Sequence, residues 1–173
     1  MTIVAFFYII AQVKQIRVIL GIDPGYARLG WGVIVARGNE CRLIEYGCIE
    51  TPKEEELPQR LAIINAELET IISKHQPTDI AIEELFFSKN VTTGLQVAHA
   101  RGVIYLRAVH HCGQIFQYKP NQVKQATTGV GNADKKQIQE MVKRILNLDK
   151  IPKPDDAADA LAIAITHAAY ARS

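Results

Sequence analysis

Three apolar segments with the composition of β-strands follow one another early in the chain. They cover residues 17–22, 31–36 and 42–50, and short stretches containing Gly, Pro or Asn separate them. Connections this short join antiparallel neighbours, because parallel strands need a crossover of a dozen or more residues. We therefore expect the fold to begin with a three-stranded antiparallel meander.

Helical and extended patterns alternate after the meander. Residues 58–74 carry apolar side chains at the three-and-four spacing of an amphipathic helix and stop before Pro77. Further helices are expected at residues 92–110, in a short segment after Pro120, and at 135–146 and 155–170, with strands at 79–83 and 114–118. Alternation of this kind predicts an α/β layer architecture.

The composition fits one globular domain. The chain has 173 residues, of which 48% are hydrophobic and 22% charged, so it can bury one substantial core. We assign this domain to residues 17–170 and treat 1–16 as an N-terminal extension. The apolar part of the extension is too short to span a bilayer and lacks the features of a signal peptide, which leaves an extra strand or helix, or an early translation start. The three cysteines show no Cys-x-x-Cys spacing, and a cytoplasmic location is expected.

Four carboxylates lie at the edges of apolar runs. Asp23 and Glu83 each end a predicted strand, while Asp156 and Asp159 share one face at the start of the apolar last helix. An ionised carboxylate is costly to bury alone, so converging carboxylates require a cation. Because no cysteine or histidine cluster accompanies them, a hard ion, Mg²⁺ or Mn²⁺, is favoured over zinc, and a metal-dependent phosphodiester hydrolase is the leading hypothesis.

Each of these acidic groups also has a purely structural interpretation. The sequence around Asp23 is typical of a turn, and the adjacent pair Glu83 and Glu84 suits a solvated strand end. Asp155 and Asp156 could cap the last helix. Asp159 lies one turn further in, where capping does not explain it.

Basic residues are concentrated in one region of the chain. Residues 99–144 contain eight Lys and Arg residues against two Asp and Glu residues. This imbalance is either the electrostatic footprint of a polyanion such as nucleic acid or ordinary surface charge.

Five motifs, in order, resemble the RuvC family of Holliday-junction resolvases. They are Gly21-Ile-Asp-Pro-Gly25, Ala81-Ile-Glu-Glu84 followed by Phe86, Ala100-Arg-Gly-Val103, Lys119-Pro-Asn-Gln-Val-Lys124, and Asp156-Ala-Ala-Asp-Ala-Leu-Ala-Ile-Ala-Ile-Thr-His167. The resemblance runs from about residue 17 to residue 168. It implies a ribonuclease-H-like fold, in which a five-stranded mixed sheet is flanked by helices.

The resemblance also implies an activity. The catalytic and metal-binding carboxylates would be Asp23, Glu83, Asp156 and Asp159, holding Mg²⁺, with two ions per subunit and Mn²⁺ as a substitute. A homodimer would resolve four-way DNA junctions in recombination and repair by nicking two strands symmetrically, leaving 5′-phosphate and 3′-hydroxyl ends. RuvA and RuvB, the branch-migration proteins, are the implied partners.

Candidate DNA-binding residues follow from the same resemblance. They are Phe86, Lys124, Lys135 and Lys136, with ordinary surface exposure as the alternative for Lys136. The segment 127–132 is interpreted either as a loop that meets phosphate or as a connector. The small and apolar residues of the 92–110 helix fit a dimer contact or the core.

Three other functions compete with junction cleavage. One is a ribonuclease-H-like nuclease acting on structured RNA, such as the shorter family linked to ribosomal RNA processing. Another is an actin-like ATPase or sugar kinase, which would need two large lobes. The last is a junction-binding module without activity, against which the four intact carboxylates argue.

Overall fold

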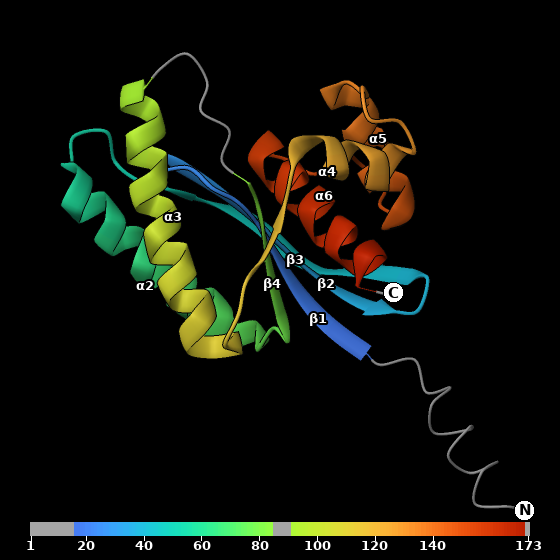
Figure 1. Ribbon diagram of the computed structural model, residues 1–173, viewed down its shortest axis with the longest axis horizontal. Helices are drawn as coiled ribbons and strands as arrows, with labels where there is room; N and C mark the ends of the chain where they lie inside the picture. Colours follow the sequence, from blue (N-terminus) through green and yellow to red (C-terminus); the bar gives the residue numbers. More distant parts are fainter. Residues whose placement is uncertain (1–15, 85–90, 172–173) are drawn as a thin grey trace, which may run out of the picture.

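A single mixed sheet of five strands organises the fold, in the order β3-β2-β1-β4-β5 (Figure 1). The computed structural model describes residues 16–84 and 91–171, without the side chains of residues 91–93. The antiparallel meander consists of β1 (Ile16–Asp23), β2 (Arg28–Arg37) and β3 (Glu40–Glu50), and β4 (Asp79–Glu83) and β5 (Phe116–Tyr118) continue the sheet in parallel with β1. The predicted five-stranded mixed sheet is confirmed. The predicted N-terminal extension lies almost entirely outside the described residues.

The parallel pairing of β1 with β4 brings two acidic strand ends together. Ile22 and Ile82 form the last pair between these two strands. Asp23 and Glu83 are the next residues of their strands, so both lie at the same edge of the sheet. Sequence spacing alone could not establish this proximity, because sixty residues separate the two positions.

Helices cover both faces of the sheet (Figure 1). On one face lie α2 (Leu57–His75) and α3 (Val91–Cys112), which close a core around Leu20, Ile64 and Ile80. On the other face lie α4 (Pro120–Thr128), α5 (Lys135–Ile145) and α6 (Asp155–Tyr170), which enclose a second core. All predicted helices are present, with ends shifted by a residue or two. None of the helices in the described ranges has the length and apolar character needed to span a membrane.

The predicted loop at residues 127–132 is wrong in its first two positions. Thr127 and Thr128 belong to α4, where their hydroxyls donate to main-chain carbonyls one turn earlier. The helix ends at Gly129, whose φ of 76° is in the left-handed region that glycine adopts without strain.

Helix α6 lies directly on the main chain of the sheet. A Cβ atom at Gly21 would overlap the carbonyl oxygen of Ala160, and one at Gly30 would overlap that of Asp156. Glycine at these two strand positions and alanine along the helix therefore permit a close approach. This packing places the first turns of α6 beside the acidic edge of β1.

Candidate active site

Three of the predicted carboxylates line one cavity of about 220 Å³. Asp23 comes from the end of β1, Glu83 from the end of β4, and Asp159 from the second turn of α6. All three are half-buried. Lys124 from α4 and Lys135 from α5 complete the polar wall, while Val123, Ile138 and Ile163 are among the apolar residues beneath it.

Asp156 lies next to this cavity and is held by an arginine. Its Oδ2 is 3.0 Å from Nη2 of Arg28, which is also 3.6 Å from a carboxylate oxygen of Glu50. The N-cap position of α6 is Pro154, so the N-capping role considered for Asp155 and Asp156 is wrong, although both lie in the first turn, where the helix dipole favours acidic side chains. Asp155 instead pairs with Lys153 at 2.5 Å and with Lys135 at 3.8 Å.

The carboxylates raise one another's proton affinity. Burial raises the pKa of Asp23 from 3.8 to about 7, and repulsion by Asp159, Glu83 and Asp156 adds to the effect. Burial likewise raises the pKa of Glu83 and of Asp159, with repulsion from Asp159 acting on Glu83 and from Asp156 acting on Asp159. Burial is therefore the main reason that these carboxyl groups resist ionisation, and their mutual repulsion adds to it.

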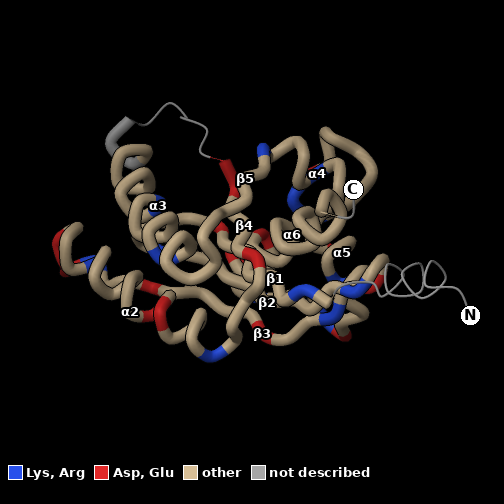
Figure 2. Tube along the Cα trace, turned by 60° about the horizontal axis from the view of Figure 1, so that its bottom comes forward, with Lys and Arg blue, Asp and Glu red and all other residues tan. Residues whose placement is uncertain are grey.

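Lysine and arginine side chains partly balance this charge. Lys135 Nζ is 2.9 Å from Asp159 Oδ2; burial alone would lower the lysine pKa, but this contact and the neighbouring aspartates raise it. Arg101 and Lys124 act on Glu83 and oppose the rise in its pKa. Figure 2 shows the acidic end of β4 close to basic segments around α4.

The donor set fits a hard divalent cation. The available groups are carboxylate oxygens, the ligands that Mg²⁺ and Mn²⁺ prefer. Within the described ranges, no three Asp, Glu, His or Cys side chains converge closely enough to ligate one ion in their present orientations. Lys135 and Arg28 form ion pairs with the carboxylates of Asp159 and Asp156.

The remaining predicted residues are not gathered at this site. Lys136 lines a separate groove of about 450 Å³ formed by residues of α4, α5 and their connection. Glu84 is absent from the residues lining the carboxylate cavity, and its main-chain N–H donates to the carbonyl of Tyr118 at 2.7 Å. Phe86 lies outside the described residues.

Two residues near the carboxylates were not assigned a role from the sequence. Arg28 carries no sequence signal, since its contact with Asp156 joins residues far apart in the chain. Arg101 stands in the motif Ala100-Arg-Gly-Val103, yet nothing in that motif identifies its partners.

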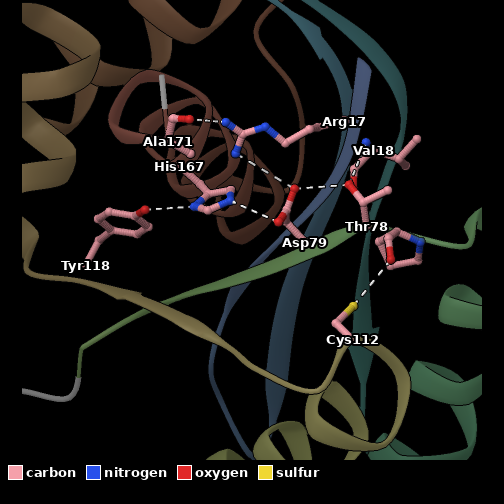
Figure 3. Close-up of polar contacts among 9 residues, drawn as sticks. Arg17, Val18, Thr78, Asp79, Cys112, Tyr118, His167 and Ala171 are labelled. Carbon is pink, nitrogen blue, oxygen red and sulfur yellow. Dashed lines mark hydrogen bonds and ion pairs between the residues drawn. The ribbon is translucent and has the colours of Figure 1, made fainter. Parts of the chain in front are cut away.

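A buried polar network fixes the far end of α6 (Figure 3). His167 is fully buried; its Nδ1 is 2.7 Å from the hydroxyl of Tyr118, and its Nε2 is 3.7 Å from Oδ1 of Asp79. Arg17 reaches the same carboxylate at 3.9 Å and donates to the carbonyl of Ala171. Burial lowers the pKa of His167, which favours the neutral ring. The network ties α6 to β1, β4 and β5.

The chain is similar in sequence to known proteins of one family. Residues 19–167 match the family model described as crossover junction endodeoxyribonuclease RuvC. The RuvC of Alkaliphilus oremlandii is 56% identical over 151 residues, which are 87% of this chain and 92% of that protein. The RuvC of Petrotoga mobilis is 52% identical, over 90% of this chain and 96% of that protein.

The fold also matches a solved structure, that of T. thermophilus RuvC in complex with Holliday junction substrate. The TM-score is 0.84 at 39% identity, and the match covers 90% of this chain and 95% of the other. The predicted ribonuclease-H-like fold is confirmed by this similarity.

Proposed function

Because this chain belongs to the RuvC family of crossover junction endodeoxyribonucleases, we propose that it resolves four-way DNA junctions at the carboxylate cavity. One observation supports the assignment of this activity to the cavity. Asp23, Glu83 and Asp159 come from three separate elements and line one cavity, where burial and then mutual repulsion raise the pKa of Asp23 to about 7. A buried cluster of like charges is costly to the fold and is typical of a site that binds a cation.

We assign metal binding to Asp23, Glu83, Asp156 and Asp159. Two Mg²⁺ ions per subunit are proposed, with Mn²⁺ as a substitute. When bound, such ions activate water and stabilise the charge that develops on the phosphate. The four carboxylates would hold the cations in their ionised form, and Asp23 is the group that Glu83 and both aspartates of α6 repel. The products are a 5′-phosphate and a 3′-hydroxyl.

Lys124 and Lys135 are proposed to bind the backbone phosphate of the cleaved strand. Both line the cavity together with the carboxylates, and both carry a primary amine. Lys135 is now paired with Asp159 at 2.9 Å, so binding of a cation by that carboxylate would release the lysine for phosphate. Lys136 is assigned a weaker contact outside the cavity, and Phe86 a stacking contact with an unpaired base.

A homodimer is proposed to cut the two strands symmetrically, because a two-fold enzyme matches the two-fold symmetry of a junction. Exposed apolar residues of α3 support a dimer contact through this helix: Leu95 is 53% exposed, Leu106 57% and Val109 50%. Residues 17–170 form the nuclease domain in this proposal. RuvA and RuvB are the expected partners, acting with it on cytoplasmic DNA in recombination and repair.

Cleavage assays with three substrates test the proposed function. A synthetic four-way junction, a linear duplex of the same sequence and a structured RNA are incubated with the protein in Mg²⁺. We expect paired nicks in the junction and none when Mg²⁺ is omitted. The Asp159→Asn variant should bind the junction but not cut it. Equal or greater cleavage of the RNA would refute junction resolution, and undiminished cleavage by Asp159→Asn would refute the assigned site.

A further inference from the structure

Arg101 is a buried cation behind the carboxylate cavity. It lies on α3 and is only 4% exposed. Its guanidinium donates to the main-chain carbonyl of Glu83, to the hydroxyl of Tyr105, and to Oε1 of Gln117 at 3.0 Å. The Tyr105 hydroxyl bonds the same Gln117 oxygen at 2.9 Å. One side chain therefore links α3 to the ends of β4 and β5.

The partners of Arg101 are unusual for a buried arginine. Its acceptors are a main-chain carbonyl, a hydroxyl and an amide, all neutral, and within the described ranges it forms no ion pair. Burial of a guanidinium is costly unless its donors are satisfied. Its charge acts on the carboxylate of Glu83, which lines the cavity. The arginine thus holds the main chain of the residue whose side chain belongs to the site.

The main chain at Glu83 depends on contacts of this kind. The pairing of β1 with β4 ends at Ile82, and β4 has only five residues. On the other side, Glu83 pairs with Tyr118 of β5, and the following N–H donates to the Tyr118 carbonyl. Arg101 supplies the additional hydrogen bond at the carbonyl of Glu83.

We propose that Arg101 is a positioning residue, which fixes the main chain at Glu83 so that this carboxylate stays beside Asp23 and Asp159 for metal binding. The inference rests on the proposed function, because it takes Glu83 to be a metal ligand. Residues that do not touch the metal but orient one of its ligands are important for binding. Their removal typically lowers metal affinity or activity by about 10- to 100-fold.

The test is Mn²⁺ binding to the full-length Arg101→Met variant, measured by calorimetry in the absence of DNA. Methionine keeps much of the side-chain volume and removes the charge and the donors. We expect Mn²⁺ to bind about 10-fold more weakly than to the wild type, or weaker still. Loss of a nearby positive charge would by itself tighten cation binding. Unchanged or tighter binding would therefore overturn the positioning role.

Arg107→Met is the matched control. Arg107 lies on the same helix but points to α2, where it donates to Asn65 at 2.5 Å and pairs with Glu69 at 3.0 Å. Its removal should lower thermal stability and leave Mn²⁺ affinity within about twofold, since it touches no element of the site. An equal loss of Mn²⁺ affinity in both variants would mean general loosening of α3 and would overturn the inference.

A second variant tests the inference if Arg101→Met does not fold. Gln117 is exposed, so Gln117→Leu is tolerated, and it removes the acceptor shared by Arg101 and Tyr105. We expect at least roughly threefold weaker Mn²⁺ binding, with junction affinity in EDTA unchanged. Wild-type affinity for Mn²⁺ in this variant would count against the inference. A wild-type protein that itself fails to bind Mn²⁺ would refute the proposed function instead.

Discussion

Replacing Asp23 with asparagine is expected to stabilise the metal-free protein while it abolishes cleavage. The pKa of Asp23 rises from 3.8 to about 7, mainly through burial and then through repulsion by the other carboxylates. This difference corresponds to about 4 kcal/mol of free energy. Asparagine has nearly the same shape and no charge, so we expect a gain of about 2 to 4 kcal/mol in the free energy of unfolding at pH 8.

The gain should depend on pH in a defined direction. Since the folded-state pKa is raised, the folded protein binds more protons than the unfolded chain between about pH 4 and pH 7. The stability of the wild type should therefore fall as the pH rises through this window. The difference between Asp23→Asn and the wild type should be near zero at pH 4 and largest above pH 7.

Urea unfolding in EDTA at several pH values measures this effect. Asp155→Asn is the control, because ion pairing with Lys153 lowers the pKa of this neighbouring carboxyl and its removal should not stabilise. Added Mg²⁺ should stabilise the wild type more than Asp23→Asn, since only binding to the folded state shifts the equilibrium. If Asp23→Asn is no more stable than the wild type at pH 8, the claim that burial and repulsion disfavour the ionised Asp23 carboxylate is refuted.

Three further predictions concern the framework around the site. Gly30→Ala should lower the free energy of unfolding, measured by thermal denaturation, by about 3 kcal/mol, because its Cβ would overlap a main-chain carbonyl of α6. The control Gly102→Ala places its Cβ in open space and should change the free energy of unfolding by less than about 1 kcal/mol. Leu106→Glu should convert a dimer into a monomer in sedimentation experiments, and persistence of the dimer would exclude this stripe of α3 as the contact. Tyr118→Phe leaves Nδ1 of buried His167 without its partner and should cost about 1 to 3 kcal/mol in urea unfolding; a loss below roughly 0.5 kcal/mol would contradict a role in anchoring α6.

Local patterns in the sequence were sufficient for the elements and their order. Strand segments joined by short turns predict an antiparallel meander, and apolar residues at three-and-four spacing predict helices, because both signals depend only on neighbours in the chain. The same reasoning identified Asp159, since a carboxylate one turn into an alanine-rich helix has no capping role. The end of α4 was misjudged because Thr127 and Thr128 satisfy their hydroxyls within the helix.

The tertiary structure decided which charged residues meet. The parallel register of β1 and β4 puts Asp23 beside Glu83, and close packing of α6 on Gly30 brings the helix carboxylates to the same edge. Lys136 lines another groove, although it adjoins Lys135 in sequence.

The roles of Arg28 and Arg101 likewise depend on contacts between distant segments. Arg28 holds the carboxylate of Asp156, and Arg101 holds the main chain at Glu83. The sequence by itself therefore determined the types of element and the acids that could form a site. Only packing determined the site itself, because distances between residues far apart in the chain depend on register and on the close approach of main chains.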